Sequence, residues 1–371
     1  MLRDLLRHGL LRAMTLLVVV SLLAACGAAA TPTAPPAAEP TASEMPTGEP
    51  AAETPEAPTE TPPSTEPAAE VPPTAPVAST APASVAPSAA PSKTAAASVA
   101  PTPPPTVAPT KPPVSTSALA THRLVTYYGH PYDERMGILG EYDPEVMIQK
   151  LKAQTAAYTA ADPSRPGLCA IELIASVAQG SPGPDGLYIA RTPIKEVEKF
   201  SQLAEKHGCL LLLDIQMGYD TIQNDVNPLL PFLQKPFVHL AIDPEFHVKR
   251  GKIPGESFGS VTAAEVTWAM QTLGDIVRAN NLPDKIIVLH QFREDMLPDK
   301  GNIKPLPNVD LVLMMDGWGL PTAKIANYNA FVRDEPIQYG GIKLFYRQDD
   351  PLLTPEEVVK LDPLPLVIIY Q

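Results

Sequence analysis

Two carboxylates, Asp243 and Glu245, stand two residues apart at the end of a short apolar run. In an extended strand, residues two apart point to the same face, and their Cα atoms lie about 6.7 Å apart. Two carboxylates this close repel each other in a partly desolvated site, which raises the pKa of one of them. A carboxyl that keeps its proton near neutral pH is a general acid, so we assign catalysis to Glu245 with Asp243 as its partner. The alternative is a strand end broken by Pro244, whose acids cap loops or pair with nearby basic residues.

Polar side chains also end the other apolar runs of the chain. If these runs are parallel strands of one barrel, their ends meet at one rim, where barrel enzymes carry their active sites. The candidate substrate-binding residues are Tyr128, His130, Glu172, Asp214, Gln216, His290, Asp316, Trp318 and Tyr346. Trp318, between two glycines, could stack on a sugar ring or plug the barrel. His239, in the middle of a run, is expected to be an ordinary core residue.

A metal site is the competing interpretation of the same rim. Glu172, Asp214, Glu245 and His290 could together bind a divalent ion such as Mg²⁺ or Mn²⁺, as in barrels that resemble the xylose-isomerase group. However, no H-x-H or H-E-x-x-H motif of fixed spacing supports it. We therefore expect no metal and no cofactor. A serine nucleophile is disfavoured because the chain has no G-x-S-x-G motif.

The rim resembles barrel glycosidases, in particular the chitinase-like group with its D-x-x-D-x-D-x-E run on strand four. Asp243 and Glu245 match the last two positions of that run, whereas Val238 and Ala241 stand where the group has aspartates. Asp316 matches the aspartate of the group's M-x-Y-D motif, without the tyrosine. The resemblance implies Glu245 as the acid, Asp243 as the residue that orients a substrate acetamido group, and Asp316 as a further contact to the sugar ring.

The elements that must position these residues alternate along residues 118–371, which contain every aromatic residue of the chain. Strands are predicted over 124–128, 168–174, 209–215, 237–243, 285–290, 309–315, 342–346 and 366–370. Helices are predicted over 144–160, 194–207, 221–233, 263–280, 323–332 and 355–361. Eight strands that alternate with helices predict an α/β fold, a (β/α)₈ barrel. An open doubly wound sheet is the alternative, but no G-x-G-x-x-G turn follows the first strand.

Two cysteines, Cys169 and Cys209, begin consecutive predicted strands. Free cysteine is often buried, so two small buried hydrophobes are the favoured interpretation. The alternative is a disulfide, since neighbouring parallel strands come close enough for one.

The first 26 residues resemble the export signal of bacterial lipoproteins. Three arginines precede an apolar run over 13–23 that is too short to span a bilayer. It ends at Leu23-Ala24-Ala25-Cys26, which resembles a lipobox, so Cys26 is the expected lipidation site. The resemblance implies an extracytoplasmic protein anchored to the lipid bilayer through acyl chains on Cys26.

Residues 27–117 differ sharply in composition from the rest. They hold 24 of the 46 prolines and no Leu, Ile or aromatic residue, so they predict a disordered tether before the domain over 118–371. The whole chain carries −13, residues 27–117 hold eight Glu and two Lys, and residues 1–26 hold three Arg and one Asp, which leaves −9 for residues 118–371. An acidic domain argues against nucleic acid as a partner and fits a neutral polysaccharide. We expect a monomer.

The rim chemistry predicts a surface-anchored barrel hydrolase of polysaccharides. The alternative with the same fold is a barrel that binds glycans or a protein without turnover. Two carboxyl groups about 5 to 9.5 Å apart in an open groove favour hydrolysis. A plugged or salt-bridged mouth favours binding.

Overall fold

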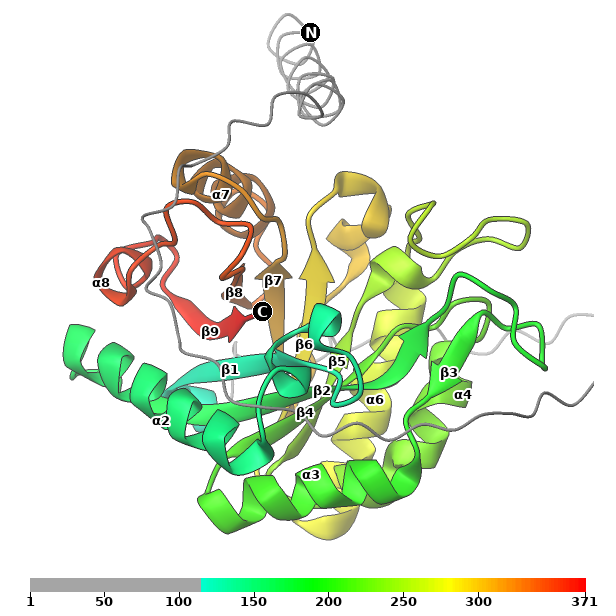
Figure 1. Ribbon diagram of the computed structural model, residues 1–371, viewed down its shortest axis with the longest axis horizontal. Coiled ribbons are helices and arrows are strands. Elements are labelled where there is room, and N and C mark those ends of the chain that lie inside the picture. The colour runs from blue at the N-terminus through cyan, green and yellow to red at the C-terminus, as the bar shows by residue number, and fades with distance from the viewer. Residues whose placement is uncertain (1–114) are drawn as a thin grey trace, which may run out of the picture. The chain divides into compact units, whose positions relative to one another are not determined.

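Apolar runs in the C-terminal part of the chain pair into a closed barrel of eight parallel strands (Figure 1). The structure, a computed structural model, describes residues 115–371. The barrel strands are β1 Arg123–Gly129, β2 Gly167–Ala178, β4 Leu210–Ile215, β5 Val238–Ile242, β6 Lys285–Gln291, β7 Val309–Met315, β8 Tyr339–Leu344 and β9 Pro365–Tyr370. The barrel closes because β1 pairs with both β2 and β9. This confirms the predicted (β/α)₈ fold.

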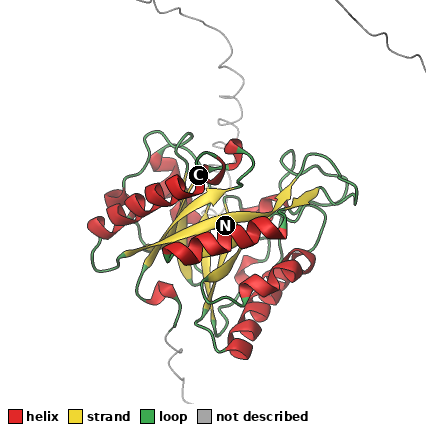
Figure 2. Cartoon of the chain, turned by 60° about the horizontal axis from the view of Figure 1, so that its bottom comes forward, coloured by secondary structure: helices red, strands yellow, loops and turns green. Residues whose placement is uncertain are grey.

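Helices connect most of the strands and lie outside the barrel (Figure 2). They are α2 Pro144–Ala161, α3 Ile194–His207, α4 Ile222–Val226, α5 Leu230–Leu233, α6 Ala263–Asn280, α7 Pro321–Tyr328 and α8 Pro355–Val358. Their starts follow local sequence signals: Asp143 caps α2, and Thr262 with Glu265 forms a capping box on α6.

The main differences from the prediction concern three elements. The single helix expected over 221–233 is divided into α4 and α5 by a 3₁₀ turn, where Pro228 and Pro231 supply no backbone donor. The strand expected over 342–346 is β8, which begins and ends earlier in the chain. A short strand that was not predicted, β3 Ile189–Arg191, pairs antiparallel with the end of β2.

Apolar side chains fill both faces of the barrel wall. One buried cluster lies inside the barrel and includes Leu124, Ala170, Leu212 and Val312. A larger one lies between the strands and the helices. Because both faces are buried, the strands are nearly continuous apolar runs, and a polar residue on the inner face is conspicuous.

The N-terminal end of the barrel is covered by residues that precede β1. Leu119, in the 3₁₀ turn Ala118–Ala120, joins the cluster inside the barrel. The hydroxyls of Ser115 and Ser117 both donate to Asp310 Oδ2. Residues 115–117, assigned by composition to the tether, therefore contact the barrel. We call them the N-terminal strap.

Cys169 and Cys209 form a disulfide, with their Cα atoms 4.8 Å apart. The expectation of two free buried cysteines is therefore wrong. Cys169 lies near the start of β2 and Cys209 directly precedes β4, which pairs with β2, so the two side chains meet at the N-terminal side of the sheet.

Within residues 115–371, no helix has both the length and the apolar composition to cross a membrane. Cys26, the export signal and residues 27–114 of the predicted tether lie outside the described residues.

Candidate active site

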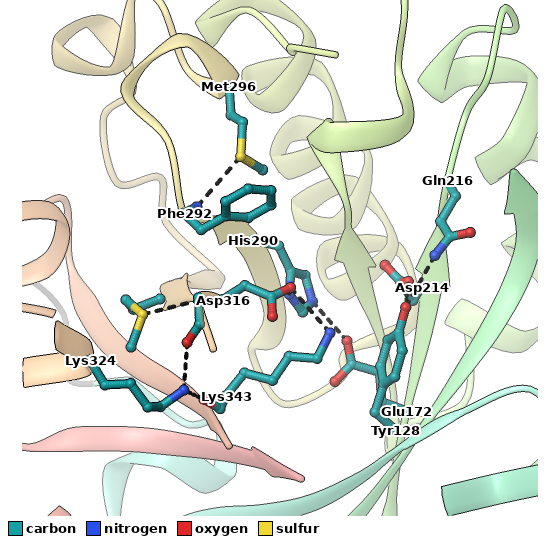
Figure 3. A network of polar contacts seen from close by, with 12 residues as sticks. Tyr128, Glu172, Asp214, Gln216, His290, Phe292, Met296, Asp316, Lys324 and Lys343 are labelled. Carbon is teal, nitrogen blue, oxygen red and sulfur yellow. Dashed lines mark hydrogen bonds and ion pairs between the residues drawn. The ribbon is translucent and has the colours of Figure 1, made fainter. Parts of the chain in front are cut away.

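A layer of polar side chains lies inside the barrel at the C-terminal ends of its strands (Figure 3). All of its members are ionisable, yet each is less than a tenth exposed. Five of them lie on strands, and two directly follow a strand. Asp243 and Asp316 stand two residues after the interior apolar residues Ala241 and Met314, so their side chains also point inward. We call this set the polar layer: Tyr128, Glu172, Asp214, Asp243, His290, Asp316 and Lys343.

His290 is at the centre of the polar layer. Its Nδ1 lies 2.8 Å from Asp316 Oδ2, and its Nε2 lies 3.0 Å from Glu172 Oε1. Burial disfavours a charged imidazole, but the hydrogen bonds and charges of Asp316 and Glu172 outweigh it and raise the pKa of His290 well above its usual value. This raised pKa favours an imidazolium ring held between Asp316 and Glu172.

Lys343 supplies the second positive charge. Its Nζ lies 3.1 Å from Asp316 Oδ2 and 3.9 Å from the centre of the Tyr128 ring. Burial works to raise the pKa of Asp316, but the charges of Lys343 and His290 prevail, so this pKa is lowered and Asp316 is ionised. The floor of the barrel mouth is therefore salt-bridged.

Tyr128 connects two further predicted residues to this floor. Its hydroxyl donates to Asp214 Oδ2 over 3.2 Å and accepts from Gln216 Nε2 over 3.1 Å. Gln216 Oε1 in turn accepts from the backbone N–H of Ala178, at the end of β2. Gln216 thus positions Tyr128.

The polar layer holds more carboxylates than cations. Burial raises the pKa of Asp214 to about 7 and that of Asp243 to about 7. Four buried carboxyl oxygens of the layer have no hydrogen-bond partner: Glu172 Oε2, Asp214 Oδ1, Asp243 Oδ1 and Asp316 Oδ1. Such atoms are costly to leave unpaired, so the layer is poised to take up positive charge or protons.

Glu245 lies next to this layer, on a different element from the one predicted. β5 ends at Ile242, and Pro244–Phe246 form a 3₁₀ turn, so Asp243 and Glu245 do not continue one strand as expected. Pro244 lacks a backbone donor and ends the strand pairing. Burial raises the pKa of Glu245 to about 9, and the charges of Asp243 and Asp316 add to the shift. Glu245 therefore carries a proton at neutral pH, as predicted, although it lies in a turn and not on the strand.

Besides Gln216 and Glu245, which adjoin the polar layer, three predicted site residues lie outside it. His130 is buried, and its Nε2 lies 3.1 Å from Thr192 Oγ1. Trp318 is 55% exposed, which excludes a plug and leaves its ring free to stack on a ligand. Tyr346 follows the shortened β8, is 42% exposed and stacks on Tyr370. His239, as expected, is a core residue, because its Nδ1 accepts from a backbone N–H.

Two lysines were missed by the sequence analysis. Lys343 stands between Ile342 and Leu344 in β8, and a lysine inside an apolar strand is the signal that could have identified it. Lys324, in α7, donates to the carbonyl oxygen of Lys343 over 2.8 Å and pairs with Asp349. It holds β8 against the loop that follows.

Two surface cavities lie outside the candidate site. One of about 750 Å³ is formed by the loops after β6 and α7 and reaches Gln291, the neighbour of His290. A smaller one of about 260 Å³ lies between α2 and α3. Neither is lined by Glu245 or by a member of the polar layer.

Comparison with known proteins was made for families, curated sequences and solved structures. No family model and no curated protein matches the chain. Similar solved structures include the Bacillus subtilis mannanase man26, 9% identical with a TM-score of 0.36 over 67% of this chain and 80% of that one. Another is the Bacillus subtilis mannanase BCman, 10% identical with a TM-score of 0.34 over 67% and 80%.

A third similar structure is the GH26 domain of an endo-β-mannanase/endo-β-glucanase from Prevotella bryantii. It is 10% identical with a TM-score of 0.30, over 67% of this chain and 75% of that one. Identities and TM-scores this low do not bear on the activity of the present chain. Its function has to be argued from its own residues.

Proposed function

We propose that the barrel hydrolyses a cell-surface or environmental polysaccharide, with Glu245 as the proton donor. The observation that carries this proposal is the position of Glu245, largely buried next to Asp243 and Asp316, which raises its pKa. The pKa of Glu245 is raised to about 9, whereas that of Asp316 is lowered. Two carboxyl groups whose environments push their pKa values apart are what acid-catalysed glycoside cleavage requires.

The remaining carboxyls have supporting roles in this proposal. Asp243 keeps the proton on Glu245 through its charge, and Asp214 is oriented by Tyr128 for contact with sugar hydroxyls. The exposed ring of Trp318 offers a stacking surface for a sugar. The acidic net charge of the chain favours a neutral glycan over an anionic one.

The test is turnover by the purified full-length protein on a panel of cell-wall and environmental glycans, followed as new reducing ends. Glu245→Gln removes the proton donor and preserves shape, so turnover should fall by about two to four orders of magnitude while binding persists. Glu256→Gln is the matched control, because Glu256 is exposed in the same loop. Full activity of Glu245→Gln on a substrate that the wild type cleaves rules out the assigned role.

Glycan binding without turnover is the second candidate function. The salt-bridged floor formed by His290, Lys343 and Asp316 favours it, because these ion pairs occupy groups that a reaction would use. The same panel separates the two functions. Saturable glycan binding with no reducing ends from the wild type supports the binding function.

We also propose that the protein is lipidated at Cys26 and acts outside the cytoplasm. The Cys169–Cys209 disulfide supports an oxidising compartment, since disulfides are rare where thiols are kept reduced. A membrane anchor suits a barrel that acts on a surface polysaccharide.

A further inference from the structure

Three side chains of the polar layer come close enough to share one metal ion. Glu172, Asp214 and His290 each offer a ligand atom, and these atoms all lie within 4.8 Å of one another. All three residues are fully buried. Ligand atoms that are each about 2.0–2.2 Å from one ion lie roughly 3 Å apart. The 3.0 Å between His290 Nε2 and Glu172 Oε1 has that value.

Unpartnered buried oxygens point independently to a cation-binding site. Glu172 Oε2 and Asp214 Oδ1 are buried without a hydrogen-bond partner, and so is Asp243 Oδ1 beside them. A buried carboxylate that gives up water without gaining a partner destabilises the fold. A cation held by Glu172 and Asp214 would give both of these carboxylates a partner.

The surrounding contacts orient the three ligands. Asp316 Oδ2 lies 2.8 Å from His290 Nδ1, which keeps a proton on that nitrogen and directs the Nε2 lone pair towards Glu172. Lys343 holds Asp316 in place from the other side. Tyr128 donates to Asp214 Oδ2, which leaves Oδ1 of that residue unoccupied. A histidine that binds a metal through one ring nitrogen often donates the N–H of its other ring nitrogen to a carboxylate, which fixes the orientation of the ring.

We propose that Glu172, Asp214 and His290 form a binding site for one divalent transition-metal ion, Mn²⁺ or Zn²⁺. Two carboxylates and one imidazole match the ligand preferences of these ions. Charge balance agrees with this choice. With a neutral imidazole, the polar layer holds four carboxyl groups against the single ammonium of Lys343, and a divalent ion offsets most of the excess. The site includes Asp316 as a positioning residue and excludes Glu245.

The competing arrangement has a proton in place of the metal. His290 is then an imidazolium that bridges Glu172 and Asp316, as the hydrogen-bond distances also permit. In that arrangement, added metal ions do not bind to the layer. The two arrangements therefore differ in a measurement that needs no substrate.

The experiment is calorimetric titration of the EDTA-stripped full-length protein with MnCl₂ and, separately, with ZnCl₂. We expect one ion per chain and a higher melting temperature on binding, since a ligand that binds only the folded state stabilises it. His290→Gln and Asp214→Asn should abolish this binding. Asp316→Asn should weaken it by about 10–100-fold, because it removes the support of His290.

Two controls separate this site from other metal binding and from catalysis. His130→Gln should keep the affinity, because His130 is a buried rim histidine bonded to Thr192 instead. Glu245→Gln should also keep it, even where it abolishes turnover, so metal binding and the proposed hydrolysis can fail separately.

The proposal is overturned if the wild type binds neither ion up to about 1 mM, or if His290→Gln and Asp214→Asn both bind as the wild type does. Melting of each variant in EDTA shows whether it folds. If His290→Gln does not fold, zinc X-ray absorption on the wild type decides, since this site requires one imidazole among the ligands.

Discussion

At the scale of single residues, neighbours rather than residue type decide which carboxyl in the barrel mouth holds a proton. Asp316 is ionised because Lys343 and the ring of His290 both contact it and lower its pKa. The pKa of Glu245 is raised because burial and the charges of Asp243 and Asp316 outweigh the opposing charges of Lys343 and His290. The division of roles between acid and base therefore depends on residues that need not touch the substrate.

Asp243→Asn tests this dependence by the sign of a shift. The negative charge of Asp243 raises the pKa of Glu245, so its removal makes the proton of Glu245 easier to lose. The alkaline limb of the pH profile of turnover should move to lower pH, and turnover itself should fall. Glu256→Gln should leave the limb in place. An alkaline limb that moves to higher pH contradicts the assigned proton donor.

Most of the polar layer could be predicted from the sequence, because parallel strands bring their C-terminal ends together at one rim. That rule alone places Glu172, Asp214 and His290 at one site. It could not supply the ion pairs, since Lys343 reaches Asp316 from another strand through a long flexible side chain. The turn at Glu245 was missed because strand alternation was extended past Pro244.

At the scale of elements, the sequence predicted the order of strands and helices but not the local breaks. Alternation of apolar runs and capped helices is visible in the residues, whereas the length of β8 depends on pairing with β7 and β9. As a result Tyr346, expected at the rim, lies in the loop beyond β8. The pairing of Cys169 with Cys209 likewise depends on how β2 and β4 meet, which composition does not reveal.

Loss of the Cys169–Cys209 disulfide should destabilise the barrel. The bridge spans 40 residues of sequence, and closing a loop of that size stabilises a fold by about 2–4 kcal/mol. We expect the double variant Cys169→Ala/Cys209→Ala to lose this amount in urea unfolding. Dithiothreitol should lower the stability of the wild type and leave the double variant unchanged. Equal sensitivity of both proteins to the reductant shows that the bridge contributes nothing.

At the scale of the whole chain, the strap and the tether should contribute differently to stability. Deleting residues 30–110 should leave the melting temperature within a few degrees, because that segment lacks core-forming residues. Deleting 30–117 also removes the hydroxyls that bond Asp310, and should lower it by roughly 5 °C. Calorimetry of both deletions measures the difference. A drop of roughly ten degrees in the shorter deletion shows that the tether docks on the barrel.

Attachment of the whole molecule to a membrane should depend on Cys26. No helix among residues 115–371 is suited to crossing a bilayer, and the apolar run before Cys26 is too short to do so. Cys26→Ser removes the thiol that would receive the lipid, so the protein should leave the membrane fraction or persist as an uncleaved precursor. Fatty-acid labelling of cells that express each form measures this. A Cys26→Ser protein that still incorporates label and sediments with membranes must be anchored in another way, and the barrel would then be held at the surface by a segment other than the lipobox.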